Sequence, residues 1–521
     1  MHISTILYYM KPYLFFICLI FTALGAMSAS VPTAYDITNY GAIGDGKTLN
    51  TEAIQKTIDA CSQKGGGTVI IPEGTWVSGT ILLKNNVTLN LNAKAILLGS
   101  TNISDYKIVD GFKDGRGSSM GYCFIGAVDI QHAGITGTGK IDGNGKLLLE
   151  KNGHSKRPFL VRFVRCSNIN VTDIHMQGPA AWTMHLFECN NARAENITIK
   201  SRGLSNNDGI DIDCCDGIII KNCDIDSGDD AICFKTTGPK PCKNIEVSGC
   251  KLNTNQGAFK IGTETFGDFE NINIHNCKVD STKGIKLYSV DGAHLKNLTI
   301  SDIDIKKTTV AVMIRLGSRL KTFREGDIKK PTGTLENVNL KKITVENASQ
   351  IALLISGTPV NNIKNVTISD ITVHLAGGGK AEDANTVLAE NEADYPEVTM
   401  FGKIMPAYGI YIRHANEIKL EHINLMTLKP DGRPAVIGTN LSNTIFSDIK
   451  LPVQPNNEPA IKLENCKYLT MSSISLPEKP ETLVQIEGPI SENISVQANF
   501  EQIKSGTEVA KKQIHIIKTN L

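Results

Sequence analysis

Eight aspartates lie within thirty residues of this 521-residue chain, in the segment NNDGIDIDCCDGIIIKNCDIDSGDDAICFK that begins at Asn206. Strand-like sequence usually avoids aspartate, because its carboxylate competes for backbone hydrogen bonds. Two carboxyl groups held close together repel when both are ionised, so one keeps a proton and can act as an acid while the other acts as a base. The cluster therefore suggests acid–base chemistry, provided that the fold brings separate aspartates together.

Similar short segments recur along the chain with a period of 23 to 27 residues. Their apolar residues alternate, as in strands with one buried face. A repeat of this period predicts a solenoid, and the absence of a leucine scaffold favours a parallel β-helix, right-handed by the usual rule for parallel crossovers. We expect an all-β, single-stranded right-handed parallel β-helix whose recurrent asparagines form a ladder at one turn. The segments are SNINVTDI (from 167), NNARAENI (190), DGIIIKNC (216), KNIEVSGC (243), ENINIHNC (270), KNLTISDI (296), ENVNLKKI (336) and KNVTISDI (364).

The period determines how the aspartates should stack. Asp208 precedes Asp229 by 21 residues and Asp230 by 22, slightly less than one coil. Because coils rise about 4.8 Å, these carboxyls should lie side by side, with Gln256 one coil further on and Lys286 another. Such a line of polar groups suits a linear polymer as substrate.

Glycoside hydrolysis needs this constellation. One carboxylic acid protonates the leaving oxygen while another carboxylate activates water, about 6.5–9.5 Å away in an inverting enzyme. Turn capping and calcium binding are the alternatives, although DGIDIDCCDG lacks the spacing of an EF-hand. We predict no metal and no cofactor.

These residues resemble glycoside hydrolase family 28, the polygalacturonase and rhamnogalacturonan hydrolase family. YDITNYGAIGDGKTLNTEAIQKTIDAC, from Tyr35, and GPAAWTMHLFEC, from Gly178, are similar to family segments, and Asn206-Asn207-Asp208 and Asp229-Asp230 match its Asn-Thr-Asp and Asp-Asp motifs. The resemblance implies that Asp229 is the general acid, that Asp208 and Asp230 activate water, and that the products are inverted.

Two family motifs are altered. Gly-His-Gly falls on Asn255-Gln256-Gly257, and Arg-Ile-Lys falls on Gly284-Ile285-Lys286, so only the lysine remains of the basic groups that help seat galacturonate carboxylates. Loss of the arginine removes a bidentate carboxylate clamp. The resemblance thus implies a pectic substrate read in a different way: a rhamnogalacturonan backbone, a side-branch galacturonide, or exo rather than endo attack.

Further substrate-binding candidates lie near these motifs. Lys260 and Glu264, in FKIGTET, are candidates to take over contacts, with ordinary surface charges as the alternative. His185, in the alternating segment TMHLFE, is predicted to face the groove, against the usual structural role of a lone histidine. Trp182 could stack on a sugar or fill a turn. With Gln256 and Lys286, the predicted substrate-binding residues are Gln256, Lys286, Lys260 and His185.

Composition and the chain's ends set further limits. Lys and Arg number 54 and Asp and Glu 53, so no charge pattern points to nucleic acid or an anionic membrane. Residues 1–29 have a lysine, an apolar run too short for a spanning helix, and small residues, which predicts a cleaved signal peptide and a secreted or periplasmic protein without a membrane anchor. Residues 30–521 are expected to form one β-helix domain, acting as a monomer.

Three other features bear on this domain. Residues 35–75 should cap its amino-terminal end, with Ile54, Ile58 and Cys61 on one helical face, and residues 376–407 interrupt the repeat as a groove wall, lid or plain loop. Cys223, Cys250 and Cys277 recur at intervals of 27, which leaves open a ladder of thiols or a disulfide. No cysteine–histidine spacing suggests zinc.

Two competing functions remain from the sequence. A polysaccharide lyase on the same solenoid would use calcium and a Lys or Arg base and release an unsaturated product. A non-catalytic glycan-binding solenoid would bind pectic fragments without cleavage.

Overall fold

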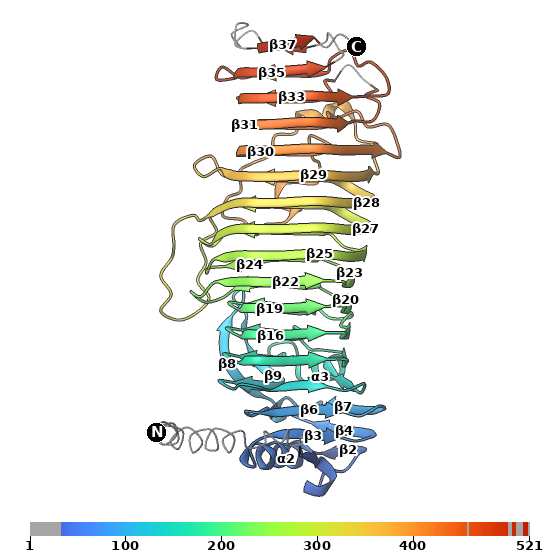
Figure 1. Ribbon diagram of the computed structural model, residues 1–521, viewed down its shortest axis with the longest axis vertical. Coiled ribbons are helices and arrows are strands. Elements are labelled where there is room, and N and C mark those ends of the chain that lie inside the picture. The colour runs from blue at the N-terminus through green and yellow to red at the C-terminus, as the bar shows by residue number, and fades with distance from the viewer. Residues whose placement is uncertain (1–32, 456–457, 499–502, 507–513, 519–521) are drawn as a thin grey trace, which may run out of the picture.

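The computed structural model describes residues 33–455, 458–498, 503–506 and 514–518 (Figure 1). The predicted signal peptide, residues 1–29, lies outside the described residues. No helix in the described part of the chain is long and apolar enough to cross a membrane.

The chain winds as a right-handed parallel β-helix, as predicted, with coils stacked along the long axis of Figure 1. Strands one coil apart pair in parallel, as β18 (Ile210–Asp213) does with β21 (Ile232–Thr236). Antiparallel pairing among the described strands is confined to the hairpin of β8 (Lys107–Lys113) and β9 (Ser119–Val128). Alternate side chains point inward, and Ile, Val and Leu stack into one core along the axis.

The strands form three parallel faces. The first face carries the candidate site and comprises β5 (Ile81–Leu82), β9, β12 (Phe159–Val164), β15 (Met184–Phe187), β18, β21, β24 (Gly257–Thr265), β26 (Gly284–Ser289), parts of the long strands below, β32 (Ile461–Glu464), β34 (Val484–Glu487) and β36 (Ile503–Ser505). The second face comprises β1 (Ala34–Asp36), β3 (Gly67–Ile71), β6 (Val87–Leu91), β10 (Gly134–Thr136), β13 (Ser167–Thr172), β16 (Asn190–Glu195), β19 (Asp216–Lys221), β22 (Cys242–Ser248), β25 (Phe269–Ser281), β27 (His294–Leu316), β28 (Thr334–Ser356), β29 (Ile363–Leu375), β30 (Ile410–Thr427), β31 (Val436–Lys450), β33 (Lys467–Ser475), β35 (Glu492–Ala498) and β37 (Ile514–Lys518). The third comprises β2 (Asp45–Leu49), β4 (Gly74–Ser78), β7 (Ala95–Gly99), β11 (Lys140–Asp142), β14 (His175–Gln177), β17 (Thr198–Lys200), β20 (Asp224–Ser227) and β23 (Lys251–Thr254).

Helix α2 (Thr51–Gln63) closes the amino-terminal end of the solenoid, as predicted. It buries Ile54, Ile58 and Cys61 on one face, and backbone N–H groups of the glycine run that follows bond to its last carbonyls. The other helices are α3 (Gly145–Asn152) and the 3-10 turns η1 (Ile37–Tyr40), η2 (Ile103–Asp105), η3 (Ala381–Asn385) and η4 (Val398–Phe401).

The predicted asparagine ladder is present at one turn. Its members adopt a left-handed backbone, with φ between 50° and 59°, which asparagine tolerates better than other non-glycine residues. Each side-chain amide donates to the asparagine of the preceding coil, as Asn271 does to Asn244 at 3.1 Å. The continuous run is Asn244, Asn271, Asn297, Asn337 and Asn365.

The described cysteines are free thiols, and all twelve are buried. Cys223, Cys250 and Cys277 point into the core one coil apart, since their neighbours pair between adjacent strands. The alternative of a thiol ladder is therefore the one found, and these residues fill the core as small apolar side chains.

Two excursions from the repeat pack on the outer side of the first face. The hairpin β8–β9 places Val109, Phe112 and Met120 over β12 and β15. The segment between β29 and β30, residues 376–409, places apolar side chains over β26, β27, β28 and β30. That insertion is thus a wall built against the solenoid rather than a plain surface loop.

Candidate active site

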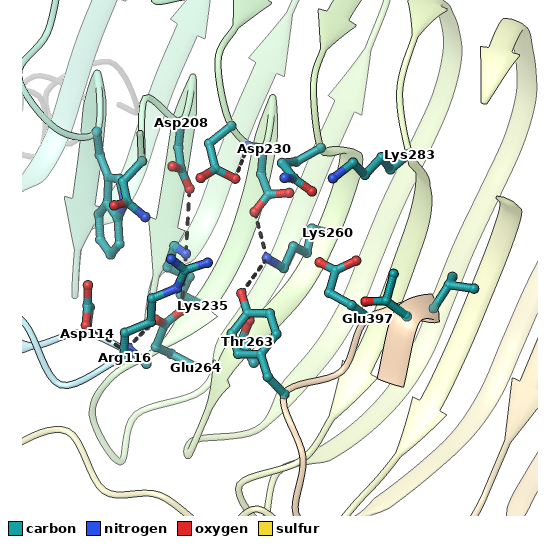
Figure 2. Close-up of a pocket in the computed structure, with 18 of the residues that line it drawn as sticks. Asp114, Arg116, Asp208, Asp230, Lys235, Lys260, Thr263, Glu264, Lys283 and Glu397 are labelled. Carbon is teal, nitrogen blue, oxygen red and sulfur yellow. Dashed lines mark hydrogen bonds and ion pairs between the residues drawn. The ribbon is translucent and has the colours of Figure 1, made fainter. Parts of the chain in front are cut away.

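A cavity of about 270 Å³ opens on the outer side of the first face, between these two excursions (Figure 2). Charged and polar groups from the coils form its floor, and Asp114–Arg116 and Tyr395–Thr399 come from the excursions. The lining residues are Asp114, Gly115, Arg116, Trp182, Asn206, Asp208, Asp229, Asp230, Lys235, Gln256, Lys260, Thr263, Glu264, Lys283, Thr309, Gln350, Tyr395, Glu397, Val398 and Thr399.

The three predicted catalytic aspartates meet in this cavity. Carboxylate oxygens of Asp208 and Asp230 lie within 4.8 Å of each other. The coil stacking that produces this is visible in the backbone, where Gly209 N–H donates to the Asp230 carbonyl at 2.9 Å. Asp229 is partly exposed, while Asp208 and Asp230 are each only 2% exposed and reach the cavity from its floor.

The column of residues above the aspartates differs from the prediction at one position. Gln256 follows Asp230 in the next coil, and the backbone N–H of Lys283 donates to the Gln256 carbonyl at 2.7 Å, so Lys283 occupies the next place in the column. Lys286 was expected there. It lies three residues further along, in register with Lys260, because strand β24 and its turn are longer than one average coil would allow.

The turn before Asp208 is fixed by its neighbour. The buried side-chain amide of Asn207 donates to the carbonyls of Pro179 and Ala181 at 3.1 and 3.0 Å, and its oxygen accepts from Leu204 N–H at 2.9 Å. This network satisfies the side chain of Asn207 completely. It orients Asp208 toward the cavity without using the Asp208 carboxylate.

Asp229 and Asp230 are adjacent in sequence, but their surroundings drive their pKa values apart. Burial, and then the neighbouring Asp230 carboxylate, raise the pKa of Asp229. Burial alone would also raise the pKa of Asp230, but the ammonium groups of Lys260, Lys286 and Lys235 outweigh it and hold that pKa below its usual value. Asp229 is therefore the residue suited to hold a proton, and Asp230 the one suited to accept one.

Asp230 is held by groups on the next coil. Lys260 donates from Nζ to Oδ2 at 2.7 Å, and Gly257 N–H donates to Oδ1 at 2.8 Å. A Cβ at position 257 would lie 2.9 Å from Oδ1, so this close approach requires glycine. The second glycine of the altered motif Asn255-Gln256-Gly257 thus keeps a role that the lost histidine did not carry.

Asp208 lies in a second charged cluster deeper in the floor. Lys235 Nζ lies 3.8 Å from Asp208, 3.5 Å from Asp211 and 3.1 Å from Glu264. Burial and then the nearby Asp211 raise the pKa of Asp208 well above its usual value, and burial raises that of Asp211 to about 8. Glu264 has a pKa of about 2, since Lys235 and then Arg319 outweigh its burial. In the empty cavity Asp230 is thus the ionised base, and Asp208 shares protons with Asp211.

The prediction that His185 faces the groove is wrong. His185 is fully buried beneath the hairpin, with its ring 5.2 Å from Trp182 and 5.3 Å from Phe159, and its Nε2 lies 3.3 Å from Asp213. Burial lowers the pKa of His185 to about 4, so the ring is neutral. Trp182 does line the cavity, where the Lys235 ammonium lies 4.4 Å from its ring centroid, and His185 supports it from below.

Lys260, Glu264 and Lys286 make contacts within the protein. Lys260 binds Asp230, and Glu264 accepts from Gly115 N–H at 2.6 Å as well as from Lys235. Lys286 is 1% exposed and donates to both oxygens of Glu397, at 2.7 and 2.8 Å. The remaining lysine of the family's Arg-Ile-Lys motif is therefore neutralised by the insertion and lies outside the cavity lining.

Several lining residues were missed by the sequence analysis. Lys235 sits in a strand next to the aspartates and could have been found from its register with Asp213. Arg116, Tyr395 and Glu397 come from the two excursions, where no repeat exists to predict a position. Tyr395 accepts from Thr263 at 2.8 Å, which fixes the insertion to the floor.

The cluster also has the composition of a weak metal site, since Asp208, Asp230 and Cys233 place one ligand atom each within 4.8 Å of one another. Lysine ammonium groups already bind these carboxylates, 2.7 Å away at Asp230 and 3.8 Å away at Asp208. The donor set thus favours acid–base chemistry over a divalent cation.

Comparison with known proteins agrees with this site. The family model of the glycosyl hydrolases family 28 matches residues 61–393, more than half of the chain. The chain belongs to glycoside hydrolase family 28 and is a glycoside hydrolase.

Relatives and solved structures give the same picture. A probable polygalacturonase of Vitis vinifera is 26% identical over 66% of this chain and 75% of its own. An exopolygalacturonase of Zea mays is 27% identical over 70% and 82%, and an exo-poly-alpha-D-galacturonosidase of Dickeya chrysanthemi is 30% identical over 40% and 42%. The family 28 exopolygalacturonase of Yersinia enterocolitica has the same fold, with a TM-score of 0.60 and 21% identity over 76% of each chain.

Proposed function

We propose that this protein hydrolyses galacturonosidic bonds of pectic polysaccharides or oligosaccharides, with inversion, from a chain end. The observation that carries the proposal is a protonated Asp229 beside an ionised Asp230 in a cavity bounded at both ends. Export, as predicted from residues 1–29, agrees with a polymeric substrate outside the cytoplasm. The relatives named as polygalacturonases and exopolygalacturonases support the substrate class.

Asp229 is assigned as the general acid. Its raised pKa keeps the carboxyl protonated, and its partial exposure puts it within reach of a sugar oxygen. It donates its proton to the departing glycosidic oxygen as the bond to the anomeric carbon breaks.

Asp230 is assigned as the principal base, with Asp208 beside it. Asp230 accepts a proton from a water molecule, whose oxygen then bonds to the anomeric carbon from the opposite side and inverts it. Asp208 lies within 4.8 Å of Asp230 and orients this water through a hydrogen bond. When Asp229 gains a proton from solvent and Asp230 releases one, the site is restored.

The two excursions support exo action. On the amino-terminal side, Phe112 of the hairpin covers the outer side of β12 and β15. On the carboxy-terminal side, Val398 and Phe401 of the insertion cover β27, β28 and β30. The outer side of the first face is accessible only between them in the described residues, which suits a chain end better than the middle of a polymer.

Asp229→Asn tests the assignment. We expect the release of reducing sugar from oligogalacturonides to fall about 100- to 10,000-fold, the usual contribution of a general acid, with little change in the melting temperature. Asp224→Asn, an exposed aspartate of the same coil, is the matched control and should keep full activity. Full activity of Asp229→Asn would refute the assignment.

The product pattern separates the alternatives. Exo action predicts that mono- or digalacturonate appears first from a long chain, as chromatography by size would reveal, while endo action gives intermediate lengths. An unsaturated product absorbing in the ultraviolet, lost with EDTA, would indicate a lyase instead. Binding of pectic fragments with no cleavage would indicate a non-catalytic protein.

A further inference from the structure

The cavity holds two cations whose charge no carboxylate of the described residues neutralises. Of the four cations in its lining, Lys235 and Lys260 are bound to acidic groups on the floor. Arg116 and Lys283 have no carboxylate within ion-pair distance among the described residues, and both side chains are exposed. A charged group kept free in a binding cavity is available to a ligand of opposite charge.

The two free cations lie on opposite sides of the catalytic aspartates. Lys283 stands in the floor column two coils beyond Asp230, a rise of about 10 Å, with Gln256 between them. Figure 2 shows Arg116 on the other side, rising from the hairpin near Asp114, below Asp208. A sugar chain crossing Asp229 and Asp230 would therefore meet a cation on each side.

Arg116 is held in position without losing its charge. Its backbone N–H donates to Asp114 at 2.9 Å, and its guanidinium lies 5.7 Å from the ring centroid of Tyr395, so that hairpin and insertion meet at this residue. Gly115 on one side is fixed by Glu264 and by Lys321, which donates to its carbonyl at 2.8 Å. A stacked guanidinium keeps its N–H donors free for a planar carboxylate.

The family's own basic groups are no longer in place to do this. Gln256 stands where the histidine would be and Gly284 where the arginine would be, and Lys286 donates both to Oε1 and to Oε2 of Glu397. The cavity thus lost its cations in the coils and has others nearby, one in the hairpin and one a single residue before Gly284.

We propose that Arg116 and Lys283 bind the carboxylates of the sugar units on the two sides of the scissile bond, and so determine specificity for uronates. The inference rests on the proposed function for its substrate class. Arg116 forms a bidentate contact with one carboxylate, and Lys283 a single ionic contact with the other, since its ammonium is a compact point charge on a flexible stem.

The test compares digalacturonate with its methyl ester, which has the same shape without the charges. For the wild type we expect kcat/KM to be higher for the free acid. Arg116→Gln should lower kcat/KM for the acid about 10- to 100-fold, the usual value of a hydrogen bond to a charged group, and leave the ester nearly unchanged. Lys283→Gln should act the same way with a smaller factor.

Matched controls are Arg193→Gln and Lys84→Gln, which remove one positive charge each at exposed positions outside the cavity. Both should keep the preference of the wild type for the acid, and melting curves would verify that all variants fold. Unchanged acid-to-ester ratios in Arg116→Gln and Lys283→Gln would overturn the proposal.

Binding separates this proposal from the proposed function. Calorimetry with Asp229→Asn measures the affinity for digalacturonate and for its ester, with and without Arg116→Gln. If the acid binds more tightly through Arg116 but the wild type cleaves no galacturonide, the proposed function fails and this inference stands. If the acid and the ester bind equally, the inference fails whatever the protein cleaves.

Discussion

At the residue scale, one amino acid type performs different tasks because its surroundings differ. Asp229 has no cation in direct contact, so burial raises its pKa, while Asp230 accepts from Lys260 and Gly257 and has its pKa lowered. The sequence showed that both were present and close to Asp208. It did not show which lysine would lie on which carboxylate, because this depends on the length of each turn.

Lys260→Met should change the pH dependence of activity. Asp230 works as a base only when ionised, so activity falls as the pH drops through its pKa, and the ammonium of Lys260 holds that pKa low. Without this ammonium the pKa of Asp230 rises and the acid limb of kcat/KM moves to higher pH. Loss of one charge-assisted hydrogen bond, about 1.5–3 kcal/mol, predicts a roughly 10- to 100-fold loss at acid pH and less at neutral pH.

The measurement is a pH profile of kcat/KM on a digalacturonide, with Lys84→Met as the control. A uniform loss at every pH, or a fall in melting temperature that accounts for the loss, would show that Lys260 only supports the fold.

At the scale of elements, the repeat and the excursions had different predictability. Ile54 and Ile58 of the capping helix, and the asparagines of the ladder, follow from periodic patterns and were predicted. Arg116 and Tyr395 lie in segments without a period, so nothing in the sequence fixes their position relative to the coils. The error over Lys286 has a related cause, since the irregular register of β24 with β26 displaces it from the column that Lys283 occupies.

Phe401→Ala tests whether the insertion closes the cavity. Phe401 is 5% exposed, and the guanidinium groups of Arg315 and Arg413 lie 5.5 and 5.1 Å from its ring centroid. Its loss removes packing typically worth about 3–5 kcal/mol for a buried phenylalanine, and so should release the insertion from the coils. We expect faster proteolysis within residues 376–409 and a shift of products from short ends toward intermediate lengths.

Val387→Ala is the matched control, because Val387 lies in the same insertion but is 92% exposed. It should leave both proteolysis and products unchanged. If Phe401→Ala speeds proteolysis but the products stay short, the insertion is not what limits the enzyme to chain ends.

At the scale of the whole molecule, repetition separates stability from function. Each coil is stabilised mainly by its two neighbours, through stacked apolar side chains inside and the asparagine ladder outside. The cavity takes residues from the same coils but from another turn, and no member of the ladder lines it. A change in the ladder should therefore alter stability without altering catalysis.

Asn271 offers the sharpest test, because it has a left-handed backbone and two ladder contacts. Its amide donates to Asn244 at 3.1 Å and its oxygen accepts from Asn297 at 3.1 Å, with φ at 56°. Asn271→Ala removes both hydrogen bonds and adds the cost of a left-handed alanine, which together predict a loss of about 2–3 kcal/mol in the free energy of unfolding. Asn271→Gly removes the same bonds but tolerates this φ, so denaturant unfolding should place it between alanine and the wild type. Both variants should keep the kcat of the wild type; equal losses of stability for the two would mean that the backbone conformation costs nothing, and a loss of kcat would mean that the ladder and the catalytic column are coupled through the coils.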